Sequence, residues 1–447
     1  MTSHVQTYLT PPQVDILIIN GLVALPWGIE AVNIGLHQGS IVFIGADTPP
    51  AQKTIDAKGL HVLPGCIDAQ VHFREPGLTH KEDLESGTRG AALGGITTVL
   101  EMPNTNPSTT TAQALADKLA LTQGRVWTNI QFFMGACPEN ATQLAELEIL
   151  PGCSGVKIFM GSSTGSLLVD DAKALEQMFA SGRRRICVHA EDEARLKERK
   201  ALAIEEGHPR AHPIWRDEET GFLATQQAVA LAEKYHRPVH VLHVTTAQEA
   251  AFLAQHKRWA TMEVLPQHLT LTAPECYERL GTLAQMNPPI REQYHQDALW
   301  HAVQTGVVDV IASDHAPHTR EEKALPYPQS PAGLTGVQTM LPLMLNHVHQ
   351  GRLSLQRLVD LLCANPARLF ELHGKGRITV GADADLTLVD LNAKHIITND
   401  WIASKVGWTP YDGMTVTGWP VMTIVNGQVV MRDDELLGRP TLTPLTA

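Results

Sequence analysis

Short apolar segments with a strand-like alternation of apolar and polar residues occur near both ends of the chain. Residues 14–63 form several such segments, separated by Asn-Gly and Gly-Ser breaks that are typical of hairpins. A similar pattern returns over residues 377–432. Two β-rich regions that flank a long middle segment predict one small β-sandwich built from both ends of the chain.

The middle of the chain alternates apolar, β-rich runs with longer stretches of helical periodicity. Repetition of strand and helix predicts a parallel sheet whose strands are joined by helices. Eight repeats predict an α/β fold in which the sheet closes into a (β/α)8 TIM-like barrel. The predicted barrel strands cover residues 62–68, 96–102, 127–134, 155–160, 185–189, 238–243, 260–265 and 307–313.

These patterns divide the chain into three segments that form two structural units. Residues 1–62 and 373–447 are predicted to form the two parts of the β-sandwich, and residues 63–372 the catalytic barrel. Long connections follow the fifth strand, at residues 190–220, and the seventh strand. Both connections are placed to lie over the mouth of the barrel.

Composition and charge narrow the class of protein. The 447-residue chain is 43% hydrophobic and 18% charged, which suits a globular core. A formal net charge of -12 argues against a broad nucleic-acid or membrane surface, but it leaves room for a local basic pocket. Neither a signal peptide nor a membrane-spanning run is expected. Scattered cysteines without C-x-x-C spacing predict reduced, mostly buried thiols and a cytoplasmic protein.

Polar residues follow several of the predicted barrel strands. Catalytic residues of such barrels lie at the C-terminal ends of the strands, so these side chains are expected to converge on one mouth. A single histidine at a strand end is more often a packing residue than a ligand. The joint occurrence indicates a site, because histidines and an aspartate from different strands offer the ligands that zinc-like ions prefer: His72, His189, His243 and Asp314.

A set of short motifs adds a resemblance to a known family. They read, in order, DAQVHFREPGLTHKED, EMPNTNPST, VKIFMGSSTG, VHAEDE, LHVTT, MNPPIRE and SDHAPHTREEK. The chain resembles the amidohydrolase superfamily, and most closely its class I dihydroorotases, over nearly its whole length. Several single motifs are shared with hydantoinases and allantoinases. The resemblance implies a metal-dependent cyclic amidohydrolase that interconverts dihydroorotate and N-carbamoyl-L-aspartate in pyrimidine biosynthesis.

The resemblance also implies how metal would be held. Lys157 lies between apolar residues of a central strand, where a buried ammonium would be costly and would repel cations. The family pattern implies a carbamylated Lys157 that bridges one or two zinc ions; a lysine that reaches a surface carboxylate is the alternative. His72 and Asp314 would bind the first ion, and His189 and His243 the second. Asp314 would also act as the general base.

Recognition of the substrate would depend on the carboxylate of dihydroorotate. A planar guanidinium suits a carboxylate, and Arg74 is the candidate donor, with an ion pair to Glu75 or Asp83 as the alternative. His315 is expected to be a structural neighbour of the site. The other substrate-binding residues implied by the resemblance are Asn104, Asn287, His318, Ala332 and Gly333.

One position departs from the pattern of related hydrolases. Gln70 stands where a His-x-His pair would have its first histidine, and a glutamine oxygen is a weaker zinc ligand than imidazole. Three outcomes stay open: two metal ions with one bound loosely, a single ion, or an inactive partner of aspartate carbamoyltransferase. Retention of the other site residues favours an active enzyme with a weakened first metal position. A hydantoinase- or allantoinase-like activity is the alternative, and a homodimer is the expected assembly.

Overall fold

The central sheet has eight strands that follow one another in chain order. The computed structural model describes residues 14–163 and 167–440. Strands β8 to β15 pair in parallel, each with the next along the chain. Val71, at the end of β8, and His315, after β15, form a parallel bridge that joins the first strand to the last. The sheet therefore closes into the barrel that the strand–helix alternation predicts.

The observed strands overlap all of the predicted barrel strands. Their residues are buried, because helices cover the outside and side chains fill the inside. The strands span Cys66–Val71 (β8), Ile96–Glu101 (β9), Asn129–Gly135 (β10), Cys153–Phe159 (β11), Ile186–His189 (β12), Val239–Val241 (β13), Ala260–Val264 (β14) and Val310–Ile311 (β15).

The first predicted strand, residues 62–68, is in fact two strands in different sheets. β7 (His61–Pro64) pairs with strands of the small domain, and β8 begins the barrel at Cys66. Gly65 separates them where no side chain fits, because a Cβ atom there would lie 2.2 Å from Thr97 Oγ1. The apolar pattern did not predict this break, since both strands are buried and read as one continuous apolar run.

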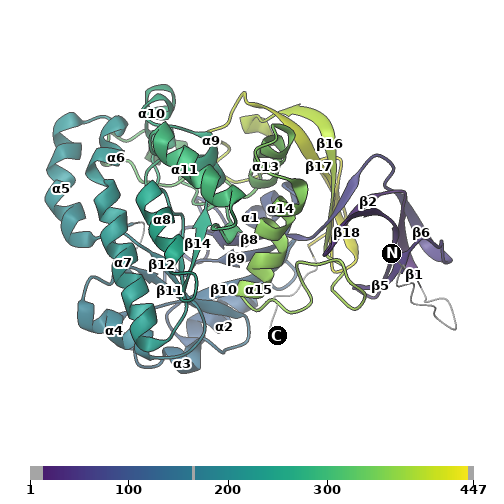
Figure 1. The fold of residues 1–447 in the computed structure, drawn as a ribbon, viewed down its shortest axis with the longest axis horizontal. Coiled ribbons are helices and arrows are strands. Elements are labelled where there is room, and N and C mark those ends of the chain that lie inside the picture. Colours follow the sequence, from purple (N-terminus) through teal and green to yellow (C-terminus); the bar gives the residue numbers. More distant parts are fainter. Residues whose placement is uncertain (1–13, 164–166, 441–447) are drawn as a thin grey trace.

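Helices join the barrel strands and surround them (Figure 1). Most of the longer ones begin at an aspartate or threonine whose side chain accepts a hydrogen bond from the first turn, as at Asp83, Asp192 and Asp217. The helices are α1 (Leu84–Leu93), α2 (Ala112–Thr122), η1 (Pro138–Asn140), α3 (Leu144–Leu147), α4 (Ala172–Ala180), α5 (Glu193–Glu206), η2 (Pro209–Ala211), α6 (His212–Trp215), α7 (Glu218–Tyr235), α8 (Ala247–Gln255), α9 (Pro266–Thr270), α10 (Glu275–Leu280), η3 (Gly281–Ala284), α11 (Gln293–Gln304), α12 (Arg320–Lys323), α13 (Met340–His349), α14 (Leu355–Val359), η4 (Asp360–Ala364), α15 (Asn365–Leu369) and η5 (Asn399–Trp401).

Both chain ends contribute to the small domain, as predicted. A four-stranded sheet has the order β5-β4-β1-β6, and a seven-stranded sheet has the order β19-β18-β17-β16-β7-β2-β3. The two sheets share an apolar core to which Ile34 and Ile55 of one sheet and Leu386 and Ile424 of the other belong. The strands are β1 (Val14–Ile19), β2 (Leu22–Leu25), β3 (Gly28–Ala31), β4 (Asn33–His37), β5 (Ser40–Gly45), β6 (Ala51–Asp56), β16 (Leu386–Ile396), β17 (Thr415–Val425), β18 (Gln428–Arg432) and β19 (Glu435–Leu436).

Two further predictions concern the whole chain. All six cysteines are free thiols and five of them are buried, which confirms the expectation from their spacing. Within residues 14–163 and 167–440, no helix has both the length and the apolar composition needed to cross a membrane. The domain limits at residues 62 and 372 stay predictions.

Candidate active site

One pocket opens at the C-terminal ends of the barrel strands, with an empty volume of about 360 Å³. Every predicted metal-binding residue lines it, and so does every predicted substrate-binding residue except His318. The barrel therefore brings together residues that are more than two hundred positions apart in the chain, such as His72 and Asp314. The sequence did not predict that Phe159, Ser163 and Ala316 would also line this pocket.

Three residues of the pocket have a left-handed backbone conformation. The φ angle is +65° at Arg74, +39° at His243 and +47° at Asp314. Such angles are uncommon for residues other than glycine, and they persist where the surrounding structure fixes them. All three positions come just after a barrel strand, where the chain leaves the sheet.

His189 and His243 form one half of the pocket's polar lining. His189 Nε2 donates to Glu191 Oε2 over 2.8 Å, so Nδ1 of the same ring carries a lone pair. That Nδ1 faces His243 Nε2 at 3.0 Å. Burial, the nearby His189 and the nearby Lys157 lower the pKa of His243 well below its usual value. Two neutral imidazoles thus face each other inside the pocket, and His243 Nδ1 is buried without a hydrogen-bond partner among the described residues.

Glu191 is itself held by Arg216. Arg216 Nε donates to Glu191 Oε1 over 3.0 Å and to Oε2 over 3.1 Å. Burial opposes ionisation of Glu191, but the charge of Arg216 and the hydrogen bond from His189 lower its pKa to about 2. In metal sites, a histidine ligand is usually oriented by a carboxylate that accepts a hydrogen bond from its other ring nitrogen. Neither residue was predicted from the sequence, although Glu191 lies two positions after His189 in VHAEDE.

His72 and Asp314 form the other half of the polar lining. His72 Nδ1 donates to Asn104 Oδ1 over 2.7 Å, which leaves a lone pair on Nε2. Nε2 faces Asp314 Oδ1 at 3.1 Å. Burial lowers the pKa of His72, which opposes protonation of the ring at neutral pH. A neutral nitrogen and a carboxylate oxygen therefore face each other as two acceptors, an arrangement that a cation between them would stabilise.

The donor atoms fit metal binding, but as two pairs and not as one complete ligand set. Within the described parts of the chain, no group of three or more His, Cys, Asp or Glu side chains could hold a metal ion. A complete set therefore needs a further oxygen donor from the pocket. Lys157 lines the same pocket, but an ammonium group has no lone pair to offer.

Lys157 has the environment of a reactive amine. Its side chain is 1% exposed, and Nζ lies 4.6 Å from the ring centroid of Phe159. Burial lowers the pKa of Lys157 to about 8, so that part of the population is the uncharged amine near neutral pH. No ion pair joins Lys157 to a described carboxylate, and the alternative that it reaches out to a surface carboxylate is therefore wrong.

Gln70 contacts the same carboxylate oxygen as His72. Its Nε2 donates to Asp314 Oδ1 over 3.1 Å, and its Oε1 is buried without a hydrogen-bond partner among the described residues. The glutamine therefore orients Asp314. Its unpartnered oxygen is the only atom through which it would bind a cation.

Arg74 is buried at the edge of the pocket. Its Nε donates to the carbonyl oxygen of Pro317 over 3.2 Å. Glu75 pairs instead with Arg125, and Asp83 with Lys405, so the alternative of an ion pair with either acid is wrong. Burial lowers the pKa of Arg74 to about 10, and its guanidinium stays charged at neutral pH. A buried guanidinium that faces a pocket and has no ion pair among the described residues is suited to an anionic ligand.

His318 lies behind Arg74 and connects it to the next loop. Lys81 Nζ donates to His318 Nδ1 over 3.1 Å, so the ring carries its proton on Nε2. Nε2 lies 3.1 Å from the carbonyl oxygen of Ala332 and 3.3 Å from Arg74 Nη2. Gly333 is a predicted substrate-binding residue, but its N–H donates to the carbonyl oxygen of Gln285 over 2.9 Å.

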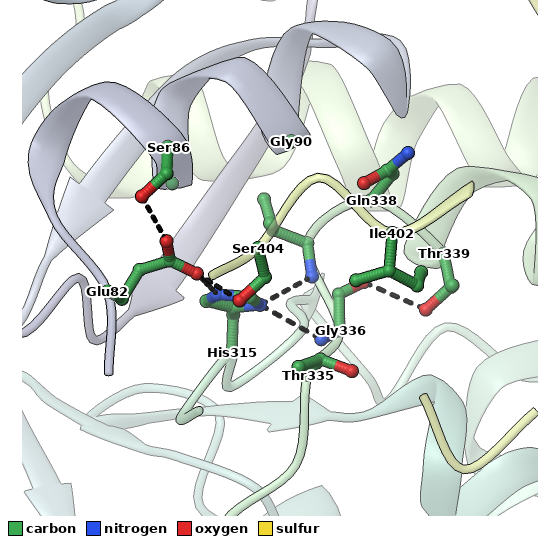
Figure 2. Close-up of a pocket in the computed structure, with 12 residues that line it drawn as sticks. Glu82, Ser86, Gly90, His315, Thr335, Gly336, Gln338, Thr339, Ile402 and Ser404 are labelled. Atoms are coloured by element: carbon green, nitrogen blue, oxygen red, sulfur yellow. Dashed lines mark hydrogen bonds and ion pairs between the residues drawn. The ribbon is translucent and has the colours of Figure 1, made fainter. Parts of the chain in front are cut away.

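A second, smaller pocket is lined by His315, the residue after Asp314. Figure 2 shows the polar network around this pocket. The carboxylate of Glu82 accepts hydrogen bonds from the hydroxyls of Ser86 and Ser404, and it lies 3.3 Å from His315 Nε2. His315 Nδ1 accepts from the N–H of Gly336 over 3.0 Å. His315 is thus a structural neighbour of the active site that ties the Asp314 segment to α1 and to the segment around Ser404.

Replacing Glu82 with glutamine is expected to destabilise the protein by about 1–3 kcal/mol, because the new amide N–H₂ would face donors in a buried network. The measurement is the thermal unfolding midpoint, with the exposed Glu205→Gln as the matched control. An unchanged midpoint for Glu82→Gln would mean that the network contributes little to stability.

Comparisons with known proteins bear on these residues. The sequence profile described as the Amidohydrolase family matches residues 61–430. A dihydroorotase of Methanothermobacter thermautotrophicus is 36% identical over 91% of this chain and 92% of that protein. A dihydroorotase of Halobacterium salinarum is 38% identical over 83% of this chain and 87% of its own. Among solved structures, the L-hydantoinase (dihydropyrimidinase) from Arthrobacter aurescens has a TM-score of 0.91 at 30% identity, covering 96% of this chain and 98% of that one.

Proposed function

The chain belongs to the amidohydrolase family, and from that premise we propose that it is a dihydroorotase, which reversibly hydrolyses the cyclic amide of dihydroorotate to N-carbamoyl-L-aspartate. The observation that carries the choice of substrate is Arg74, a buried, charged guanidinium at the pocket without an ion pair among the described residues. Dihydroorotate brings a carboxylate to such a group, whereas the hydantoin ring lacks one. The proposal places the reaction in pyrimidine synthesis.

The carboxylate of the substrate would bind to Arg74, beside Asn104 and the loop of Ala332. Charge-assisted hydrogen bonds from a guanidinium to a carboxylate are among the strongest in proteins. His318 would support this group of donors, because its Nε2–H donates to the carbonyl oxygen of Ala332 on one side of the anion site. Asn287, which also lines the pocket, would bind the ring amide.

We propose further that zinc ions bind at these two pairs of facing side chains and that carbamylated Lys157 supplies the missing oxygen ligand. Carbamylation replaces a buried cation with an anion, and the lowered pKa of Lys157 makes the reactive amine accessible. His72 and Asp314 would hold one ion, and His189 and His243 the other. When bound, the metal would supply an activated water and polarise the amide carbonyl of the substrate.

Asp314 would carry the proton in this reaction. Hydrolysis forms a carbon–oxygen bond and breaks the carbon–nitrogen bond of the ring, so that the attacking water loses a proton and the departing nitrogen gains one. The Asp314 carboxylate would accept the first proton and donate it to the nitrogen. The hydrogen bond from Gln70 to Oδ1 holds this carboxylate in the pocket.

The test of the proposed function is a comparison of kcat/KM for dihydroorotate, N-carbamoyl-L-aspartate, hydantoin and allantoin, using protein purified without chelators. We expect a clear preference for dihydroorotate and its open form. Faster turnover of hydantoin or allantoin would replace the proposal with the alternative activity. A metal-free, inactive protein in a stable complex with aspartate carbamoyltransferase would support the non-catalytic role.

Arg74→Lys is expected to raise the KM for dihydroorotate by about 10- to 100-fold, because one ammonium does not reproduce the paired donors of a guanidinium. Metal content should stay unchanged, and any turnover of hydantoin, which has no carboxylate to bind, should change much less. Arg125→Lys, at the ion pair with Glu75, is the matched control. Unchanged kinetics in Arg74→Lys would remove this residue from the binding site.

A further inference from the structure

Lys323 is a buried lysine whose hydrogen bonds, among the described residues, all go to backbone carbonyl groups. It lies at the end of α12 and is 1% exposed. Its Nζ donates to the carbonyl oxygens of Gln285 over 3.0 Å, Pro331 over 2.9 Å and Gly333 over 3.1 Å. An ammonium group has three N–H donors, and each of them has one acceptor here. No ion pair joins Lys323 to a carboxylate of the described residues, and burial lowers its pKa to about 7. The three carbonyl acceptors oppose this effect, because together they accept all three protons of the ammonium form.

The three carbonyl groups belong to the two loops that supply one wall of the active-site pocket. Gln285 lies two residues before Asn287, and Pro331 and Gly333 flank Ala332. The loops also contact each other directly. Gly333 N–H donates to the Gln285 carbonyl over 2.9 Å, and Ser330 Oγ donates to Gln285 Oε1 over 2.6 Å. Lys323 therefore lies at the point where both loops meet.

The position of Lys323 is itself fixed. Thr319 and Glu322 form a capping box at the start of α12, and the hydroxyl of Thr282 donates to the Lys323 carbonyl oxygen. The Trp408 ring centroid lies 5.8 Å from Nζ. An ammonium held in this way would order the loops before substrate arrives, which lowers the entropy lost on binding.

We infer that Lys323 is a positioning residue for the substrate pocket: its ammonium holds the loop of Asn287 against the loop of Ala332 and Gly333. The Pro331 carbonyl belongs to the same trans peptide as the Ala332 N–H, which points the opposite way. Binding of a cation to that carbonyl polarises the peptide and makes the N–H a stronger donor on the far side. The kinetic consequence of this inference rests on the proposed function, whereas the ordering of the loops does not.

The test compares Lys323→Met and Lys323→Arg with the natural protein. We expect Lys323→Met to raise the KM for dihydroorotate tenfold or more, with kcat within threefold and metal content unchanged. Amide hydrogen exchange should become faster in residues 281–287 and 328–336 of this variant. Lys323→Arg, which keeps the charge and several donors, should restore most of the lost affinity and exchange protection. Ser330→Ala removes one hydrogen bond between the loops, the bond from Ser330 Oγ to Gln285 Oε1. This variant should raise KM by a smaller factor than Lys323→Met. It keeps the test decisive if Lys323→Met does not fold.

Lys375→Met is the matched control. Lys375 is also a buried lysine, but it pairs with Asp383 and Asp385 beside the small domain. This variant should unfold at a lower temperature with an unchanged KM. If Lys323→Met behaves in the same way, or loses metal and kcat together, the inference is overturned in favour of a purely structural role.

The two proposals fail in distinguishable ways. Unchanged hydrogen exchange in both loops of Lys323→Met would overturn the positioning role, even if the natural protein hydrolyses dihydroorotate. Absence of turnover by the natural protein would instead overturn the proposed function. In that case the exchange measurement alone still decides whether Lys323 holds the loops together.

Discussion

Lys157→Ala is expected to lose bound metal and activity together, with kcat/KM lower by about a thousandfold or more, a loss of about 4 kcal/mol in transition-state stabilisation. The four other predicted ligands form two separate pairs, and within the described residues no three His, Cys, Asp or Glu side chains form a binding set. The oxygen donor supplied by a carbamate would complete both sets. Metal analysis and turnover of dihydroorotate, measured on the same preparation, check this expectation.

Added acetate or propionate should restore part of the activity of Lys157→Ala. The truncated side chain leaves space beside Phe159, and a free carboxylate placed there would offer the oxygens that the carbamate supplied. Lys157→Met is the matched control, because it removes the amine without leaving that space and should respond little to added acid. Full activity of Lys157→Ala without added acid would refute the carbamate.

Asp314→Asn is expected to lower kcat by about 10²- to 10⁴-fold, the range typical of a lost general acid–base group. Asparagine has nearly the same shape, but its amide does not accept a proton at neutral pH. The loss should exceed any change in KM, because Arg74 and the loop of Ala332 stay in place. Metal content needs to be measured alongside, since an amide oxygen is also a weaker ligand than a carboxylate.

Asp309→Asn is the control for this measurement. Asp309 is another aspartate near β15, but it pairs with Lys257 and does not line the active-site pocket. This variant should retain its kcat. A kcat within tenfold of the natural protein for Asp314→Asn would assign the proton transfer to a different group.

The sequence predicted the barrel and most of the pocket for the same reason. Parallel strands of one barrel all direct their C-terminal ends to one mouth, so polar residues such as His189 and Asp314 converge once the strands are recognised. The β-sandwich followed from the alternating pattern at both chain ends. These features depend on periodicity and connection order, which are visible in a single sequence.

Other features depend on contacts that periodicity does not describe. Lys323 lies in the charged run TREEK, which resembles an exposed helix, yet tertiary packing buries it completely. The pairing of Glu191 with Arg216 joins two separate connecting segments. Only the spacing of His189 and Glu191, which places them on the same face of an extended chain, is visible in the sequence. The left-handed backbone of Asp314 likewise has no signature in the sequence.

The place of β7 between β2 and β16 has a consequence for synthesis of the chain on the ribosome. The N-terminal strands emerge first, but their apolar residues, such as Val23 and Val62, share a core with Leu386, which emerges only after the whole barrel. Until then, β7 presents an unpaired edge and an uncovered apolar face, both of which favour association with other chains. The nascent chain is therefore expected to associate with other chains more readily than the finished protein does.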